Sequence, residues 1–216
     1  MKGRYLIGVD EAGRGPLAGP VSVAAVSARV GNVKRLTSNT SNKNGLPRLR
    51  DSKQLSESQR ERWFRFLKNE KRAGRLDFAS ALVGSRTIDR RGIVRAVKLA
   101  MSRALRRLRG VAPARCAVLL DGSLTAPRAF QNQRTIIGGD RREPLIMLAS
   151  IIAKVRRDRQ MIRQARRFPA YDFAAHKGYG TAVHYRALRR HGLSPIHRLS
   201  YLTNHPVPRK TRDTPP

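Results

Sequence analysis

The chain has 216 residues, of which 46 are Lys or Arg and only 14 are Asp or Glu, so its formal net charge is +32. This length suits one domain with a hydrophobic core and a small appended part, and the charge favours a polyanionic partner such as nucleic acid. The single cysteine, Cys116, excludes an internal disulfide framework and a cysteine-based zinc site. No signal peptide is recognisable and the longest apolar stretch, residues 145–153, is too short to span a bilayer, so we expect a cytoplasmic protein.

The first predicted element is a short buried strand, residues 5–9, which is followed directly by two acids, Asp10 and Glu11. A Gly-Arg-Gly turn at residues 13–15 comes next, and the apolar run 21–26 is close enough to form an antiparallel neighbour. Carboxylates at a strand end beside such a turn suit a divalent metal next to a phosphate. The alternative is a β-hairpin whose acids are only solvated.

The later elements alternate between helices and strands, which predicts an α/β domain with parallel pairing in its second half. Residues 31–50 are polar and lack an apolar period, so we expect a loop there. The remaining expected elements are helices over residues 56–68, 87–108, 144–165 and 181–191, and strands over residues 76–83, 117–120 and 135–137.

Two further acids, Asp121 and Asp158, are candidate site residues. Asp121 follows an apolar strand in the same way as Asp10, and acids at the ends of neighbouring strands meet at one edge of a sheet. Ser150, Lys154 and Asp158 share one face of the predicted helix. The alternatives are an ordinary turn at Asp121 and a surface Lys-Asp pair on the helix. Three or four carboxylates together would meet the needs of a two-metal phosphodiesterase.

Five blocks of the sequence together resemble type 2 ribonuclease H, an enzyme that cuts RNA joined to or paired with DNA. In chain order they are DEAGRGPLAGP from residue 10, DSKQL from residue 51, LLDGSL around residue 121, ASIIAKVRRD from residue 149, and HKGYGT from residue 176. The resemblance implies an RNase H-like fold, a mixed central sheet flanked by helices. The implied parts are a catalytic domain over residues 1–168, a C-terminal helical substrate-binding part over residues 169–203, and a disordered tail over residues 204–216.

The resemblance also implies a site. The catalytic acids, which would hold Mg²⁺ or Mn²⁺, are Asp10, Glu11, Asp121 and Asp158. The Gly-Arg-Gly backbone and a tyrosine would recognise the ribonucleotide and its 2′-hydroxyl, and five other side chains would contact phosphates. The implied substrate-binding residues are therefore Gly13, Arg14, Gly15 and Tyr179 for recognition, and Lys53, Ser150, Lys154, His184 and Arg198 for phosphate.

Two points about this implied site stay open. Adjacent residues of a strand point to opposite faces, so Asp10 and Glu11 can serve one site only if the strand ends or twists near Gly13. Tyr179 could alternatively be a packing residue, although its position between two glycines favours access to a ligand.

The expected function is that of a metal-dependent endoribonuclease. It would cleave the RNA strand of RNA/DNA hybrids, and also 5′ to ribonucleotides embedded in duplex DNA, leaving 5′-phosphate and 3′-hydroxyl ends. We expect a monomer that binds these nucleic acids and no membrane. The alternative is a basic RNA-binding protein without catalysis.

Type 3 ribonuclease H is disfavoured. It would need an additional N-terminal domain, for which the strand at residue 5 leaves no room, and Gly-Lys-Gly in place of Gly-Arg-Gly. Departures from the type 2 pattern are the long 31–50 segment and Met147-Leu148, where small residues are expected.

Overall fold

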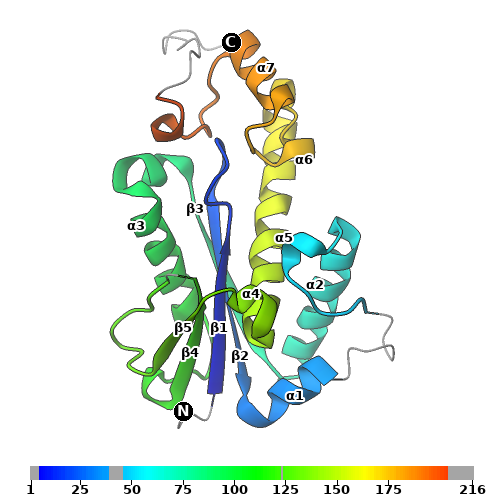
Figure 1. Ribbon diagram of the computed structural model, residues 1–216, viewed down its shortest axis with the longest axis vertical. Coiled ribbons are helices and arrows are strands. Elements are labelled where there is room, and N and C mark those ends of the chain that lie inside the picture. The colour runs from blue at the N-terminus through cyan, green and yellow to red at the C-terminus, as the bar shows by residue number, and fades with distance from the viewer. Residues whose placement is uncertain (1–4, 39–45, 123, 204–216) are drawn as a thin grey trace.

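The computed structural model describes residues 5–38, 46–122 and 124–203, and a five-stranded sheet runs through its centre (Figure 1). The strand order is β3-β2-β1-β4-β5. On one side of the central strand β1, the pairs β3-β2 and β2-β1 are antiparallel, and on the other side the pairs β1-β4 and β4-β5 are parallel. This confirms the expected mixed sheet. The strands are β1 (Tyr5–Ala12), β2 (Val21–Arg29), β3 (Asp77–Val83), β4 (Cys116–Asp121) and β5 (Gln133–Ile136).

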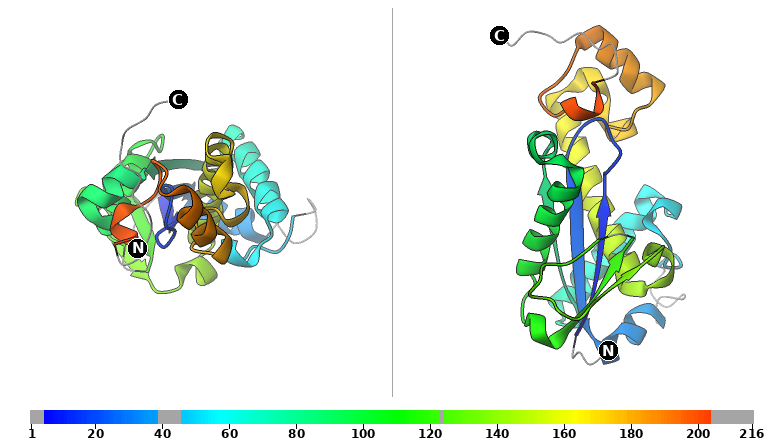
Figure 2. Two further views of the ribbon diagram at one scale, coloured as in Figure 1. Left: turned by 90° about the horizontal axis from the view of Figure 1, so that it is seen from above. Right: turned by 60° about the vertical axis from the view of Figure 1, so that its left-hand side comes forward.

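Helices cover both faces of the sheet, so the structure has three layers (Figure 2). One face packs on α3, and the other packs on α5, α2 and α1. The α-helices are α1 (Val30–Ser38), α2 (Glu57–Arg72), α3 (Ser85–Arg106), α4 (Gly139–Arg142), α5 (Pro144–Arg167), α6 (Phe173–His176) and α7 (Ala182–His191). Short 3₁₀ turns are η1 (Ser52–Gln54), η2 (Pro113–Arg115), η3 (Pro169–Tyr171) and η4 (Leu199–Tyr201).

The alternation of side chains along β1 explains why both faces are covered. Ile7 and Val9 point into the apolar core beneath α3, whereas Leu6 points into the core beneath α5. At Gly8 the start of α5 crosses the strand so closely that a Cβ atom there would lie 2.2 Å from the carbonyl carbon of Leu145. The missing side chain therefore allows the backbones of β1 and α5 to touch, which brings the middle of α5 to the end of β1.

The prediction of a loop over residues 31–50 is wrong in its first part, because α1 extends to Ser38. Leu36 is buried and Val33 packs beside it in the core under α5, so two apolar residues three positions apart suffice to anchor a short helix. Residues 39–45 lie outside the described part of the chain. The long helix α3 is interrupted at Gly92, whose φ and ψ of 75° and 159° are not helical.

The C-terminal part, from η3 onward, packs against the turn that joins β1 to β2 and against the end of α5 (Figure 1). Its small apolar core consists of Leu17, Ala18, Met161, Tyr171, Phe173, Leu188 and Leu202. Because this core includes Leu17 and Ala18, the turn is packed into the C-terminal part. The expected division at residue 168 stays a prediction, and the expected tail lies outside the described residues.

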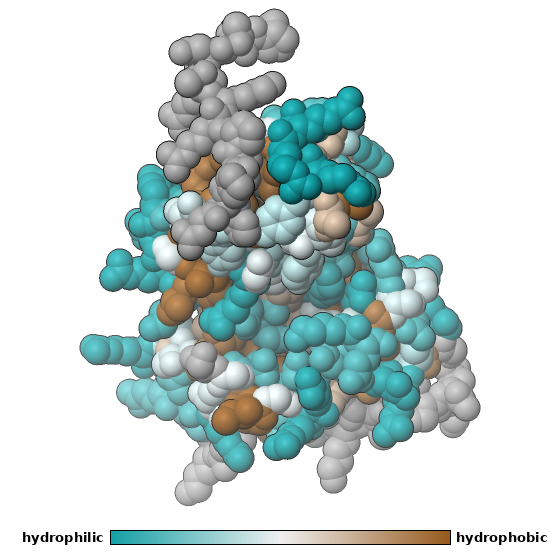
Figure 3. Space-filling view, turned by 45° about the horizontal axis from the view of Figure 1, so that its top comes forward, coloured by the Kyte–Doolittle hydropathy of each residue, from teal (hydrophilic) through white to brown (hydrophobic). Residues whose placement is uncertain are grey.

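Within the described ranges, no helix combines the length and the apolar character needed to cross a membrane. The face seen when the top of the molecule in Figure 1 is tilted forward is largely hydrophilic, with small separate hydrophobic patches (Figure 3).

Candidate active site

The acids at the ends of β1 and β4 are neighbours in the sheet. Pairing of the two parallel strands stops at Val9 and Leu120, so Asp10 and Asp121 are the next residues on adjacent strands. By the alternation of each strand, both side chains belong to the face that α5 covers. The structure therefore brings these two predicted residues together, and their charges repel.

Glu11 reaches the same place from the other face of β1. The strand does not end at the acids as expected, because β1 pairs with β2 as far as Ala12 and Ser22. It is the pairing with β4 that stops instead, which opens the side of β1 just where the acids lie. Glu11 is consequently close enough to Asp121 for their charges to interact.

Asp10 is the most strongly perturbed of these acids. Only 4 % of its surface is exposed, and this burial raises its pKa well above the usual value. The negative charges of Glu11 and Asp121 raise the pKa further, while hydrogen bonds from the Ser150 hydroxyl and from the Glu11 N–H (2.7 Å) oppose the rise. A buried carboxyl beside two other acids ionises readily only when a cation is close.

Glu11 has one engaged and one free carboxylate oxygen. Its Oε1 atom lies 3.2 Å from Nε of Arg14, without hydrogen-bond geometry, whereas Oε2 is buried and has no partner among the described residues. Burial raises the pKa of Glu11, with Arg14 lowering it and Asp121 raising it. A buried, unpaired carboxylate oxygen is costly and is suited to a ligand.

Asp140 is a member of this group that the sequence analysis missed. Its backbone N–H lies 3.3 Å from Oδ1 of Asp121 and donates to it, and its carboxylate is buried. Burial raises its pKa, and the charges of Asp51 and Asp121 raise it further. A sequence signal existed, because residues 138–140, Gly-Gly-Asp, follow β5 just as Asp121 ends β4.

The structure does not bring Asp158 to this group, which corrects the expectation. Its carboxylate lies 2.8 Å from Nζ of Lys154 and 3.6 Å from Nη2 of Arg60. Asp158 is eight residues beyond Ser150 on α5, a rise of about 12 Å along the helix. Arg60 also donates to the carbonyl of Ser52 (2.9 Å), so Asp158 fastens α2 and the segment before it to α5.

The DSKQL segment lies over the acids. Ser52 and Ser150 share a hydrogen bond of 2.7 Å, so the segment is tied to the side chain that bonds Asp10. The Lys53 side chain is 77 % exposed, with Nζ 3.6 Å from a carboxylate oxygen of Asp140. Burial lowers the pKa of Lys53, but Asp51, Asp140 and Asp10 outweigh this effect and raise it. An exposed cation thus stands at the edge of the acid group.

Residues 17 and 18, which follow the Gly-Arg-Gly turn, are hydrogen-bonded to the segment that carries Tyr179. The carbonyl of Gly178 accepts hydrogen bonds from the N–H groups of Leu17 (2.9 Å) and Ala18 (3.3 Å). Gly178 has a φ of +84°, and a Cβ atom there would lie 2.6 Å from the Ala18 carbonyl oxygen, so only glycine permits this approach. The Tyr179 side chain remains 43 % exposed, and the ring has Nζ of Lys154 5.8 Å from its centre.

His184 and Arg198 are corrected as phosphate contacts, because both are fully buried and already bonded. His184 is hydrogen-bonded to the Tyr179 carbonyl (2.9 Å) and to His197 (3.0 Å), and burial lowers its pKa to about 4. Arg198 donates to backbone carbonyls of the turn. Neither side chain can reach a phosphate at the surface.

The sequence model of the family "Ribonuclease HII" matches residues 7–204. The chain belongs to the ribonuclease HII family. It is 43 % identical to ribonuclease HII of Endomicrobium trichonymphae over 201 residues, which cover 93 % of this chain and 87 % of that protein.

Two solved structures share the fold. The ribonuclease H2 of Pyrococcus horikoshii OT3 superposes with a TM-score of 0.66 at 24 % identity, covering 91 % of this chain and 93 % of that one. Bst-RNase HIII in complex with Mn²⁺ gives 0.68 at 19 % identity, covering 93 % and 68 %. The family and the fold identify the chain as a ribonuclease H-type nuclease.

Ribonuclease HII chemistry requires divalent metal, and the residues at the strand ends fit such an ion in kind. Carboxylates are the hard oxygen ligands that Mg²⁺ and Mn²⁺ prefer, and Glu11 offers an unpaired buried oxygen. Within the described residues, however, no three acidic, histidine or cysteine side chains already converge at ligand spacing.

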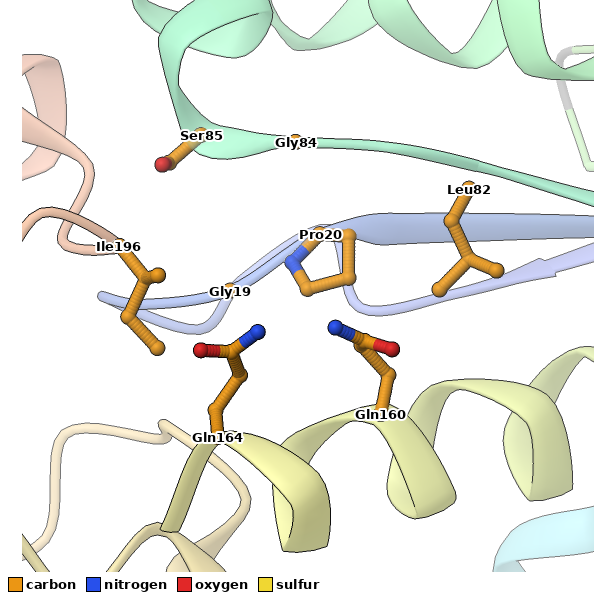
Figure 4. Close-up of a pocket in the computed structure, with 8 residues that line it drawn as sticks. All are labelled: Gly19, Pro20, Leu82, Gly84, Ser85, Gln160, Gln164 and Ile196. Atoms are coloured by element: carbon orange, nitrogen blue, oxygen red, sulfur yellow. The ribbon is translucent and has the colours of Figure 1, made fainter. Parts of the chain in front are cut away.

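A pocket of about 310 Å³ lies between the turn, the end of β3, the start of α3 and α5 (Figure 4). Its lining carries no ionisable side chain, so we assign it no part in the chemistry. The residues around it are Gly19, Pro20, Leu82, Gly84, Ser85, Gln160, Gln164 and Ile196.

Proposed function

We propose that this ribonuclease HII is a Mg²⁺- or Mn²⁺-dependent endonuclease that cleaves the RNA strand of RNA/DNA hybrids and cuts 5′ to ribonucleotides embedded in duplex DNA. The products carry 5′-phosphate and 3′-hydroxyl ends. The observation that supports it most is the arrangement at one end of the sheet. The acids of β1 and β4 lie beside an exposed lysine, and residues 17 and 18, just after the Gly-Arg-Gly turn, are hydrogen-bonded to the segment that carries Tyr179.

The proposed metal ligands are Asp10, Glu11, Asp121 and Asp140, the last of these replacing Asp158. When bound, the ions would supply the activation of a water for attack on phosphorus and the stabilisation of the leaving oxygen. The raised pKa of Asp10 matches this role, because a cation favours the ionised form that burial disfavours. Ser150 holds the Asp10 carboxylate in place and is itself held by Ser52.

The other side chains bind and orient the substrate. Lys53 supplies an exposed ammonium group for the phosphate next to the cut, and Lys154 stands beside the ring of Tyr179. Tyr179 and the backbone at residues 13–15 read the 2′-hydroxyl, the group that distinguishes a ribonucleotide from its deoxy counterpart. The proposed setting is ribonucleotide excision repair in the cytoplasm, by an enzyme that acts as a monomer.

The test compares three variants on an end-labelled RNA/DNA hybrid with Mg²⁺. Asp121→Asn and Asp140→Asn should lose cleavage while still binding the hybrid, since each removes one proposed ligand. Asp158→Asn should cut at a rate much closer to that of the wild type. Full activity of Asp140→Asn together with inactivity of a folded Asp158→Asn would reverse the assignment. Tight binding without any product in the wild type would favour the basic RNA-binding protein.

A further inference from the structure

Two fully buried arginines, Arg157 and Arg198, lie beneath the turn at residues 13–20. Among the described residues, neither guanidinium forms an ion pair with a carboxylate. Their hydrogen bonds go to backbone carbonyls instead. Burying a charge without an opposite charge costs free energy, so we ask which part of the backbone these two arginines hold in place. What these two side chains hold is the backbone on which recognition is proposed to depend.

Arg198 bonds three carbonyls of the turn. Its Nη2 and Nη1 donate to the oxygens of Gly13 and Arg14, each at 2.7 Å, and its Nε donates to that of Gly19 at 3.0 Å. The Tyr201 hydroxyl donates to the same Arg14 oxygen at 2.8 Å. Two carbonyls in succession are thus drawn toward the interior of the protein.

Peptide geometry then fixes where the donors point. In a trans peptide the C=O of one residue and the N–H of the next point in opposite directions. Since the carbonyls of Gly13 and Arg14 point inward to Arg198, the N–H groups of Arg14 and Gly15 point outward. No hydrogen bond between described residues uses either N–H group, and Gly15 is exposed. Two adjacent free donors therefore face the surface.

Arg157 joins this turn to the segment that carries Tyr179. Its guanidinium donates to the carbonyls of Pro20 (3.0 Å), Ala18 (3.2 Å) and Lys177 (3.0 Å), and its carbon lies 5.6 Å from the centre of the Tyr179 ring. Figure 4 shows Gly19 and Pro20 between α5 and the start of α3, with Ile196 to one side of Gly19. The turn and the tyrosine are held as one unit.

We propose that Arg198 is a positioning residue for 2′-hydroxyl recognition: it turns the Arg14 and Gly15 N–H groups outward, and Arg157 fixes them relative to Tyr179. The inference rests on the proposed function and assigns discrimination to two side chains that do not touch the substrate. A fork of donors is needed, because a lysine ammonium cannot bond three carbonyls in the same plane.

The first test uses the wild-type protein in EDTA and follows amide hydrogen exchange by NMR. In the free protein, the Arg14 and Gly15 amides should exchange much faster than those of Leu17 and Gly19, which have backbone partners. A duplex with one embedded ribonucleotide should slow both at least tenfold, and the same duplex in all-DNA form should not. Equal protection of the four amides in the free protein would overturn the inference, and so would equal slowing by the two duplexes.

The second test measures how strongly variants prefer the ribonucleotide duplex over the all-DNA duplex in EDTA. Arg198→Met and Arg198→Lys should each lose at least tenfold of the wild-type preference, and cleavage at the ribonucleotide should fall more than cleavage of a continuous hybrid. Preference retained by Arg198→Lys would show that charge alone suffices and would overturn the inference.

Two controls separate positioning from general damage. Leu188→Ala removes a fully buried side chain from the apolar core that also contains Leu17 and Ala18, but no hydrogen bond to a carbonyl of the turn, and Arg106→Met removes an exposed arginine. Both should keep the preference at temperatures where they are folded, and an equal loss in Leu188→Ala would contradict the inference. If the wild type neither cuts nor prefers the ribonucleotide duplex, the proposed function fails, whereas the exchange pattern of the free protein still tests the orientation of the turn.

Discussion

Replacing Gly8 by alanine should force β1 and α5 apart, because their backbones touch at this residue. The added Cβ would lie 2.2 Å from the carbonyl carbon of Leu145, 2.4 Å from its oxygen and 2.5 Å from the nitrogen of Ile146. Carbon atoms in favourable contact are about 3.5–4.0 Å apart, so the helix has to move by more than about 1 Å. Backbone atoms cannot rotate away as a side chain could.

The expected cost lies at the upper end of that for overpacked cores, about 3 kcal/mol. The reduced freedom of the unfolded chain returns less than about 1 kcal/mol. For a chain of this size, a loss of about 2–3 kcal/mol lowers the melting temperature by roughly 5–10 °C. Cleavage should also fall, since Ser150 on α5 would be displaced from Asp10 on β1.

Gly31→Ala is the matched control, measured alongside by circular dichroism during heating. Gly31 lies in α1 with no atom within 4 Å of an added Cβ, and alanine is favoured over glycine in helices by about 1 kcal/mol. Its melting temperature should equal or exceed that of the wild type. A Gly8→Ala protein with the same melting temperature as the wild type would refute the close packing of β1 on α5.

Three further predictions concern stability. Asp158→Asn leaves Lys154 and Arg60 without their carboxylate and should lower the free energy of unfolding, measured in urea, by about 3 kcal/mol. The control Glu61→Gln breaks the more exposed ion pair with Arg159 and should lower it by less than about 1 kcal/mol. Equal losses in the two variants would show that the ion pairs of Asp158 do not stabilise the fold. Burial lowers the pKa of His184 to about 4 and, with the charge of His184, that of His197 to about 3, so below pH about 6.5 the unfolded chain takes up protons that the folded chain excludes. The free energy of unfolding should therefore fall between pH 6.5 and pH 5, by up to about 1.4 kcal/mol per pH unit for each of the two histidines. This pH dependence should be weaker in His184→Gln. An unchanged pH dependence in that variant would show that the two histidines are already protonated in the folded protein. Finally, Mg²⁺ should raise the melting temperature of the wild type, and EDTA should reverse the rise, because an ion that binds only the folded state stabilises that state. The rise should be much smaller for Asp10→Asn. Equal rises in the two proteins would show that the ion binds elsewhere.

Much of the fold could be predicted from the sequence, because short apolar runs mark the strands and an acid follows directly after the runs that form β1 and β4. The strands around Asp10 and Asp121 were expected at nearly their observed positions, and parallel pairing placed the two acids together. What the sequence could not decide was which later acid completes the group. Helical spacing singled out Asp158, but the helix carries it past the site, whereas the turn after β5 brings Asp140 back to Asp121.

The buried polar residues show a second limit of sequence reasoning. In such a basic chain Arg198 and His184 look like surface residues that contact phosphate. Their burial depends on carbonyl partners, and for Arg198 these lie more than 170 positions away in the chain, at Gly13, Arg14 and Gly19. The metal and phosphate roles assigned to the remaining side chains stay predictions.

The most direct test of the proposed function uses end-labelled duplex DNA with a single embedded ribonucleotide, incubated with Mg²⁺, Mn²⁺ or EDTA. We predict one cut on the 5′ side of the ribonucleotide in the presence of metal and none in EDTA. Cleavage of long hybrids alone would contradict the reading of the junction by Tyr179 and the Gly-Arg-Gly turn. Binding without any cut would contradict the assignment of a nuclease site to the acids at the ends of β1 and β4.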